Sequence, residues 1–380
     1  MSRAPRVRRG RCRGVVLAAR VVLLAGWAGC QPDVPTVPGP ESSALRAGLQ
    51  GQLVWEEPRG GIRTLQLPAG TPAVVRAAAA RDAASFPVVT ALAGPDELGR
   101  IAYLEEDFAT GPAASTDPAP RLKTIRLDGT ADTVVATWAT GAPANGTRLV
   151  GAHLALSRRG GHVLLLRDLE PRQWTGSLLY EGRLELWNVD DGSHRALGQS
   201  ALEASLVWLP DGKQFLACVG AARSEVPTDA LGLAHQGDEE RTWDRLPAMY
   251  CIDVATGRRV LLGIGTEAAV APDGAVAWIG GYLGQQRLPW LRVELATGAQ
   301  QPVAVPGLAG RIVAAAGPEV VLYQGWPTAG TEVRWTAAGS RPGGVPLLSL
   351  KAAHLGSQEF ATVVPYLDPR SRLSFGALPR

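Results

Sequence analysis

One short turn recurs in this chain and limits the folds that it can adopt. Leu209-Pro210-Asp211-Gly212 and Ala271-Pro272-Asp273-Gly274 are near copies, and each lies between two short apolar runs. Proline and aspartate favour a tight turn, and glycine supplies the positive φ that closes it. Such a turn, recurring between apolar runs, is typical of a repeated antiparallel sheet. It predicts an all-β protein built as a β-propeller.

Two sets of turns can be followed along the sequence. The first set joins the innermost strand of each sheet to its neighbour: Pro95-Asp96, Arg159-Gly160-Gly161, Pro210-Asp211-Gly212, Pro272-Asp273-Gly274, Gly317-Pro318-Glu319 and Asp368-Pro369. The second set joins the two outer strands of each sheet, and each turn ends in glycine because such hairpins need a positive φ there. These turns are Leu67-Pro68-Ala69-Gly70, Leu127-Asp128-Gly129, Val189-Asp190-Asp191-Gly192, Val254-Ala255-Thr256-Gly257, Leu295-Ala296-Thr297-Gly298 and Thr336-Ala337-Ala338-Gly339. The six outer hairpins predict a single propeller of six blades, with seven blades as the alternative.

Two runs follow the sixth predicted outer hairpin, residues 360–365 and 372–377. The first blade lacks an innermost strand, because its first apolar run begins only at Gln52. The C-terminal runs therefore either complete the first blade and close the ring non-covalently, or form part of a seventh blade.

The N-terminus predicts an export signal. Seven arginines and no acidic residue occupy residues 1–29, and an apolar run ends at Cys30. Ala28 and Gly29 before this cysteine resemble the bacterial lipobox, although Trp27 stands where leucine is usual. The resemblance implies a lipoprotein signal peptide over 1–29 and acylation of Cys30, with an ordinary secretory signal as the alternative. Gln31 rather than aspartate after the cysteine favours attachment to the outer membrane.

The segment after Cys30 is rich in proline, with four prolines among residues 31–40. It predicts a lipidated tether over 30–48 and a propeller over 49–380. Without the seven N-terminal arginines, 31 basic residues face 35 acidic ones. This mildly acidic balance, with the arginines scattered among acids, argues against a nucleic-acid partner.

A family resemblance rests on the better-preserved repeats. The pattern Pro210-Asp211-Gly212-Lys213-x-Phe215, followed by Tyr250-Cys251-Ile252-Asp253-Val254-x-x-Gly257, resembles the repeat of TolB-type and related WD-like bacterial propellers. Trp187-Asn188-Val189-Asp190-Asp191-Gly192 and Val293-Glu294-Leu295-Ala296-Thr297-Gly298 fit the second half of this repeat. The match is good only over about 202–304. It implies a propeller in the cell envelope, and it says little about role, because many functions share this scaffold.

The candidate binding residues lie in or beside long connections, which all emerge on one face of a propeller. The longest, residues 221–247, is a recognition loop, a cation site made by its acids, or a solvated excursion. Tryptophans beside such loops are candidates for partner contact. The candidate binding residues are Trp174, His235, Asp238, Glu239, Glu240, Trp243, Trp290 and Trp326.

Sequence signals for catalysis are weak. None of the five histidines forms a His-Glu-x-x-His pair, no Gly-x-Ser-x-Gly elbow occurs, and the sequence indicates no cofactor. We therefore expect a binding or assembly scaffold for an envelope protein or polymer, rather than an enzyme. The alternative is a metal-dependent lactonase-like or esterase-like hydrolase with its site in the channel mouth. Three or more converging carboxylates or amides there would indicate that alternative.

Cys218 and Cys251 flank the longest loop, in strands expected to pair as antiparallel neighbours. In an exported protein this placement predicts a disulfide between them. The alternative is two strand cysteines that point to opposite faces of the sheet.

Overall fold

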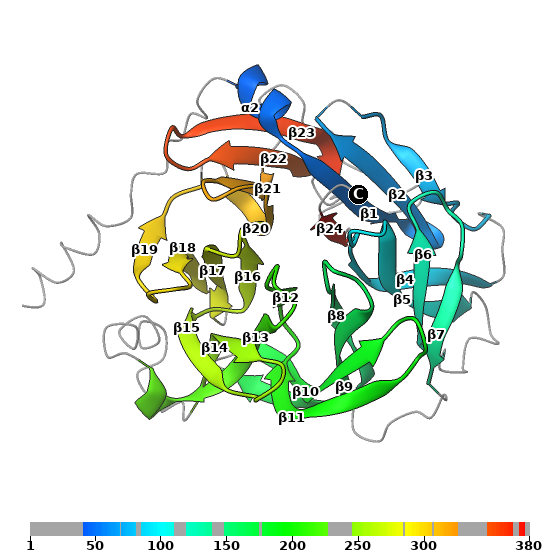
Figure 1. Cartoon of the computed structure of the whole chain (residues 1–380), viewed down its shortest axis with the longest axis horizontal. Coiled ribbons are helices and arrows are strands. Elements are labelled where there is room, and N and C mark those ends of the chain that lie inside the picture. Colours follow the sequence, from blue (N-terminus) through cyan, green and yellow to red (C-terminus); the bar gives the residue numbers. More distant parts are fainter. Residues whose placement is uncertain are drawn as a thin grey trace, which may run out of the picture.

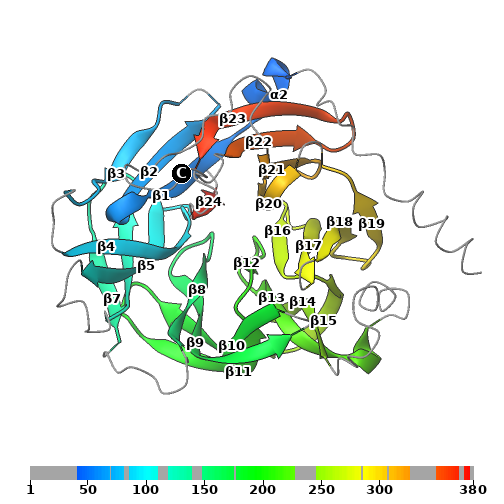
Figure 2. The same ribbon diagram turned by 180° about the vertical axis from the view of Figure 1, so that it is seen from behind.

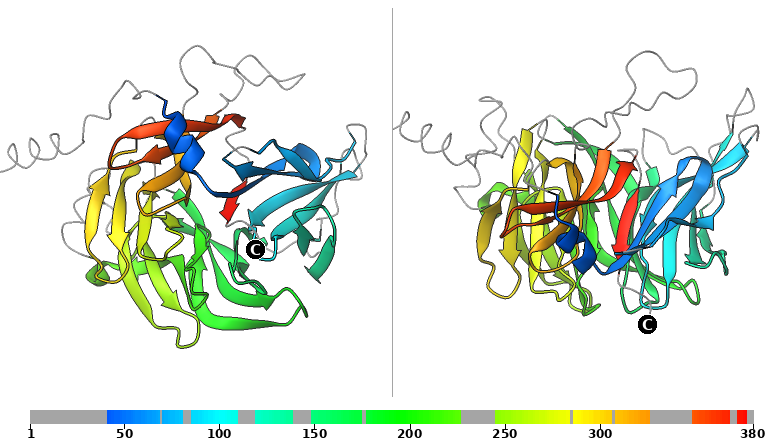
Figure 3. Two further views of the ribbon diagram at one scale, coloured as in Figure 1. Left: turned by 45° about the horizontal axis from the view of Figure 1, so that its top comes forward. Right: turned by 90° about the horizontal axis from the view of Figure 1, so that it is seen from above.

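The computed structural model describes residues 41–68, 70–80, 85–109, 119–138, 148–174, 177–226, 245–283, 286–305, 308–325, 348–367 and 372–376, and the statements below concern these residues. Their strands form six four-stranded antiparallel sheets around a central channel (Figure 1, Figure 2). The six-bladed all-β fold predicted from the turns is confirmed. Figure 3 views the ring obliquely and from the side.

We number the blades in chain order and give their strands from the channel outward. Blade 1 holds β24 (Leu373–Gly376), β1 (Gly51–Glu57), β2 (Gly61–Leu67) and β3 (Ala73–Arg76). Blade 2 holds β4 (Ser85–Ala93), β5 (Arg100–Ala109), β6 (Arg121–Arg126) and β7 (Thr133–Thr137). Blade 3 holds β8 (Arg148–Leu156), β9 (His162–Trp174), β10 (Ser177–Asn188) and β11 (His194–Leu202).

Blade 4 holds β12 (Leu206–Trp208), β13 (Gln214–Ala222), β14 (Arg245–Asp253) and β15 (Arg259–Ile264). Blade 5 holds β16 (Glu267–Val270), β17 (Val276–Leu283), β18 (Gln286–Glu294) and β19 (Gln300–Val303). Blade 6 holds β20 (Leu308–Ala315), β21 (Val320–Gly325), β22 (Leu348–His354) and β23 (Glu359–Leu367). Two 3-10 turns, η1 (Pro58–Gly60) and η3 (Arg223–Glu225), follow β1 and β13.

The inner and outer turns of blades 2 to 6 meet on one side of the ring, which we call the short-turn face. The prediction that Asp368-Pro369 is an inner turn is wrong: this pair, outside the described residues, lies between β23, the outermost strand of blade 6, and β24, the innermost strand of blade 1. In blades 2 to 6 the amide just after the third strand donates a hydrogen bond of 2.9 Å to a carbonyl of the first turn. The pairs are Leu127 with Gly99, Val189 with Gly161, Val254 with Lys213, Leu295 with Ala275, and Leu355 with Glu319. This repeated bond ties the inner and outer hairpins of each of these blades together.

The ring closes through its C-terminus. Strand β24 pairs with β1, with Leu373 opposite Trp55 and Gly376 opposite Gln52. The Gly94 amide of blade 2 also donates to Ser374 Oγ over 3.1 Å. The expectation that residues near 372–377 complete the first blade is confirmed, and the seven-blade alternative is not supported by the sheet order.

The sixth outer hairpin lies elsewhere in the chain than the sequence predicts. Residues 360–365 belong to β23, the outer strand of blade 6, and its turn from β22 is formed by residues 355–358. Thr336-Ala337-Ala338-Gly339, which lies outside the described residues, precedes β22 and therefore belongs to an earlier connection. The true turn escaped notice because its positive-φ residue is Gln358 (φ 57°) rather than glycine.

The core consists of apolar layers between neighbouring blades. Trp278 is fully buried and packs with Tyr323 and Val321 between blades 5 and 6. The Trp208 indole N–H donates to the Ala155 carbonyl over 3.0 Å and thereby links blade 4 to blade 3. Large rings fill such wedge-shaped gaps with much apolar area, and burial of one ring stabilises the fold by roughly 2–3 kcal/mol.

Residues 41–48, which the sequence assigns to the predicted tether, contact the outer strand of blade 6. Helix α2 (Ser43–Gly48) is capped by Ser42, whose hydroxyl accepts from the Leu45 amide over 3.1 Å. The Ser42 amide donates to Phe360 O over 2.8 Å, and Glu41 accepts from the Thr362 amide over 2.7 Å. The segment therefore docks on β23. None of the helices in the described part of the chain has the length and apolar character needed to span a bilayer.

Candidate functional site at the channel mouth

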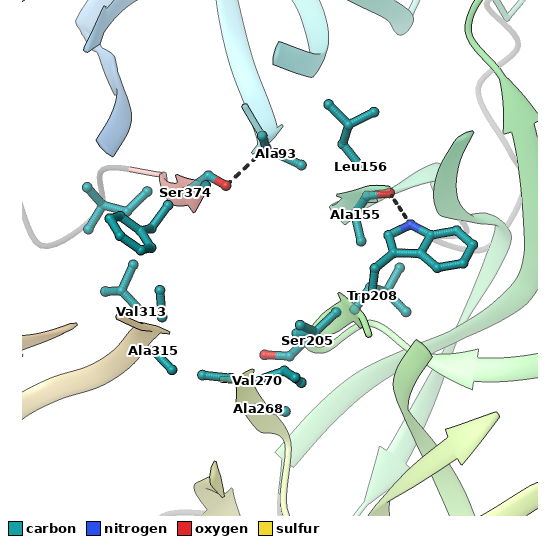
Figure 4. A pocket seen from close by; sticks show the side chains of 18 of the residues that line it. Ala93, Ala155, Leu156, Ser205, Trp208, Ala268, Val270, Val313, Ala315 and Ser374 are labelled. Carbon is teal, nitrogen blue, oxygen red and sulfur yellow. Dashed lines mark hydrogen bonds between the residues drawn. The ribbon is translucent and has the colours of Figure 1, made fainter. Parts of the chain in front are cut away.

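The channel runs along the ring axis between the innermost strands of the six blades. It encloses a cavity of about 530 Å³. Small and aliphatic residues line its middle (Figure 4): Ala93, Ala155, Leu156, Ala268, Val270, Val313 and Ala315. Innermost strands crowd the axis, so small residues keep the channel open. A space of this size and character suits a small ligand with an apolar body.

The two ends of the channel differ. At the short-turn end its lining comes from the tight turns, with Pro95, Pro210 and Pro272. Arg158 lies there too, and its guanidinium donates to the Pro272 carbonyl over 3.1 Å and pairs with Glu97 at 3.4 Å. At the other end, which we call the long-connection face, the links between blades and the second-to-third-strand connections emerge.

Charged side chains gather at the mouth on the long-connection face. A second cavity of about 250 Å³ shares His153, Ser205, Arg311 and Arg372 with the channel. Its remaining lining includes Glu203, Glu267 and Tyr282. Because four residues line both spaces, the second cavity is the vestibule of the channel.

Local backbone structure fixes the positions of these groups. The Ser205 amide donates to Thr266 O over 3.1 Å, which ties the connection before blade 4 to the connection before blade 5. Gly281 has φ 110° at an irregularity of β17, and a Cβ there would collide with the Thr266 side chain. The glycine therefore lets β17 approach this link closely, directly beside Glu267.

Burial and mutual charge set the electrostatics of the vestibule. Burial lowers the pKa of Arg311; Arg372 lowers it further, whereas Glu267 and Glu56 act in the opposite direction. Burial raises the pKa of Glu267, against the influence of Arg311 and Arg287. The Glu203 carboxylate accepts a hydrogen bond from the Ala152 amide over 2.6 Å, so it braces β8. The site therefore presents two guanidiniums, the carboxyls of Glu203 and Glu267, and an imidazole.

Cys30, the predicted lipidation residue, lies outside the described residues, as do most of the predicted binding residues: His235, Asp238, Glu239, Glu240, Trp243 and Trp326. Trp174 is the last residue of β9, and its side chain is not among those described. Trp290 was predicted to contact a partner from an exposed position, but it is buried. Its side chain is 4% exposed in the core between blades 5 and 6, where its ring occupies the space left by Gly280.

The predicted disulfide between Cys218 and Cys251 is not formed in this structure, where both thiols are free. Cys218 lies opposite Met249, and Cys251 lies opposite Leu216. The two cysteines therefore share one face of the sheet but are staggered by two residues along it, and such diagonal neighbours are roughly 7–8 Å apart. A disulfide needs a closer approach. The alternative, opposite faces, is wrong as well. Burial raises the pKa of the Cys251 thiol to about 11.

The charged vestibule was missed by the sequence analysis. The available signal was a charged residue within an innermost strand that is otherwise small and apolar, such as Arg311 in Leu308–Ala315 and Glu267 in Glu267–Val270. Such a residue faces either the channel or the next blade, and the sequence does not decide between them. Among the described residues there is no group of three or more His, Cys, Asp or Glu side chains arranged to hold a metal ion.

The fold resembles that of solved bacterial propellers. TolB from Acinetobacter baumannii matches with 14% identity and a TM-score of 0.50, over 87% of this chain and 67% of that one. This chain has a TolB-like fold. A putative TolB from Agrobacterium tumefaciens matches with 12% identity over 87% of this chain and 99% of that one, with a TM-score of 0.45.

A third similar structure is a puromycin-hydrolyzing peptidase of Mycobacterium tuberculosis, with 14% identity and a TM-score of 0.49. The match covers 84% of this chain but only 46% of the peptidase. Comparison with protein-family models and with curated protein sequences found no match. At these identities the likeness concerns the fold alone.

Proposed function

We propose that this protein is a lipid-anchored propeller of the cell envelope that acts as a binding or assembly scaffold for an envelope protein or polymer. The partner docks on the long-connection face. Residues 1–29 serve as the signal peptide, and an acylated Cys30 attaches the tether to the outer membrane. The resemblance of the N-terminal sequence to a lipobox and the TolB-like fold support this location.

The vestibule is the observation that carries the proposal. It opens on the face with the longest connections, and it holds half-buried charged groups. Charged groups that stay half-buried at an open mouth reduce stability, so their retention favours a role in binding. The donor set of two guanidiniums fits an anionic group better than a metal ion. This favours the binding role over a metal-dependent lactonase-like or esterase-like hydrolase in the mouth.

Copurification tests the docking proposal. The full-length tagged protein is solubilised with detergent from envelopes, beside a variant in which residues 227–244 are replaced by a short glycine-containing turn. The shortened protein should keep a cooperative thermal transition, since the excised segment joins two adjacent strands, and should lose the partner. A control variant, Lys213→Ala, changes an exposed side chain of the short-turn face and should retain it. Retention of all partners by the shortened protein would contradict docking on this face.

Membrane fractionation tests the anchor separately. Cys30→Ala should move the protein into the soluble fraction or arrest it as a precursor. Unchanged membrane association of Cys30→Ala would reject lipid attachment, while docking on the long-connection face would remain open to the first test.

A further inference from the structure

The two arginines of the vestibule come from neighbouring blades at the point where the ring closes. Arg311 belongs to β20 of blade 6, and Arg372 directly precedes β24 of blade 1. Both line the vestibule and the channel. The two guanidiniums thus line the same space from adjacent sides, and their positive charges repel each other.

Their charge is only partly compensated. Within the described part of the chain, the ion pairs shorter than 4.0 Å include neither Arg311 nor Arg372. Glu267 is the carboxyl that acts most strongly on Arg311, yet burial favours the neutral form of Glu267 itself. Glu203 and Glu267 line the same space. A half-buried guanidinium with five donors that lies outside ion-pair distance of every described carboxylate is ready to bind an anion.

The channel beyond the arginines has the opposite character. Between the vestibule and the short turns its lining is mainly alanine, valine and leucine (Figure 4). A ligand whose anionic head lies at Arg311 and Arg372 therefore meets apolar surface along the rest of its length. Burial of a short alkyl chain there adds affinity at each methylene.

We propose that the vestibule and channel together form a site for a small amphiphilic anion, with its carboxylate or phosphate head at Arg311 and Arg372 and its apolar part in the channel. The inference rests on the proposed binding role and names the ligand chemistry of the same face. Glu267 lies beside the head group, so its carboxylate opposes binding whenever it is ionised.

Calorimetric titration of the purified protein with defined probes tests this site. The probes are octanoate, octyl phosphate, acetate and octanol. Octanoate or octyl phosphate should bind at least tenfold more tightly than acetate, which lacks the tail, and than octanol, which lacks the charge. The stronger of the two octyl anions identifies the head group. Equal binding of octanol and the octyl anions would overturn the proposal, as would no binding of any probe.

Substitutions locate the head group. Arg311→Met and Arg372→Met should each weaken binding of the preferred anion at least tenfold, and Arg311→Lys should lie between Arg311→Met and the wild type. Arg158→Met is the matched control, because it removes a guanidinium from the other end of the same channel. It should change the affinity less than twofold. Loss of binding in Arg158→Met but not in Arg311→Met would reject the assigned end.

Glu267→Gln keeps the test decisive if an arginine variant fails to fold. Removal of the opposing carboxylate should tighten anion binding about threefold or more, a gain that a purely structural role does not produce. Weaker or unchanged binding would contradict the site. Because these titrations need no partner, a protein that binds no probe yet still copurifies its partner refutes this inference and leaves the docking proposal intact.

Discussion

The short-turn face and the long-connection face of the ring follow different rules. On the short-turn face, five blades repeat the same 2.9 Å bond between their two hairpins, and the turns carry aspartates that cap their own backbone amides. On the long-connection face the connections between second and third strands differ in length from blade to blade, and the vestibule collects Arg311, Arg372 and Glu267. One face therefore specifies the fold, whereas the other is free to differ between proteins that share it.

Removal of the closing strand should have the largest effect, because it damages both faces at once. A chain that ends at Leu367 loses β24, its pairing with β1 and the Ser374 contact to blade 2. It also exposes the apolar layer between blades 6 and 1. We expect a loss of about 4 kcal/mol or more in the free energy of unfolding, measured by urea denaturation. A chain that ends at Gly376 is the control and should stay within about 0.5 kcal/mol of the wild type.

Asp96→Ala should cause the next largest loss and tests the short-turn face. The Asp96 side chain is buried and accepts from the Leu98 amide at 2.9 Å, the Arg100 amide at 2.8 Å and Arg100 Nε at 2.9 Å. Its removal leaves these part-buried donors without their buried acceptor, which costs about 2–3 kcal/mol. Asp273→Ala is the matched control in the turn of blade 5, where the exposed carboxylate accepts from Ala275 only. Equal losses for both variants would contradict the argument from burial.

Trp208→Phe should separate stability from binding. It removes the indole N–H that binds Ala155 O and leaves that buried carbonyl without this donor. We expect a loss of about 1–2 kcal/mol in the free energy of unfolding. The affinity for the preferred octyl anion should change less than twofold, since Trp208 lies near the short turns. A tenfold loss of affinity would show that the two ends of the channel are not independent.

Glu267→Gln should have the smallest effect on stability, visible mainly as a change with pH. Burial raises the pKa of Glu267 in the folded protein, so as pH rises the unfolded chain loses this proton first. Wild-type stability therefore falls as pH increases from the ordinary glutamate pKa of about 4.3 upward. Glu267→Gln lacks this fall, so its advantage should grow from pH 4 to pH 8 in parallel urea titrations. A difference that shrinks with rising pH would mean that the carboxylate stabilises the fold.

The turns were predictable from sequence because their chemistry is local. Pro210-Asp211-Gly212 encodes its own geometry, whichever blade surrounds it. The outer turn of blade 6 lacks this local signature, because Gln358 rather than glycine takes the positive φ there. The register of Cys218 and Cys251 could not be predicted for a different reason, because a long connection does not fix the pairing of its two strands as a tight hairpin does. The vestibule depends on blades far apart in sequence, such as Arg372 beside Arg311, so only the closed ring reveals it.

Site-specific photo-crosslinking in cells compares the two faces most directly. Tyr282, 42% exposed, lies at the vestibule, and Leu98, 64% exposed, lies in the first turn of blade 2 on the short-turn face. Each is replaced in turn by a photo-reactive phenylalanine analogue, and adducts are detected after irradiation of intact cells. We predict adducts with a partner from position 282 and none from position 98. Adducts from position 98 alone, or equally from both positions, would contradict the assignment of binding to the long-connection face.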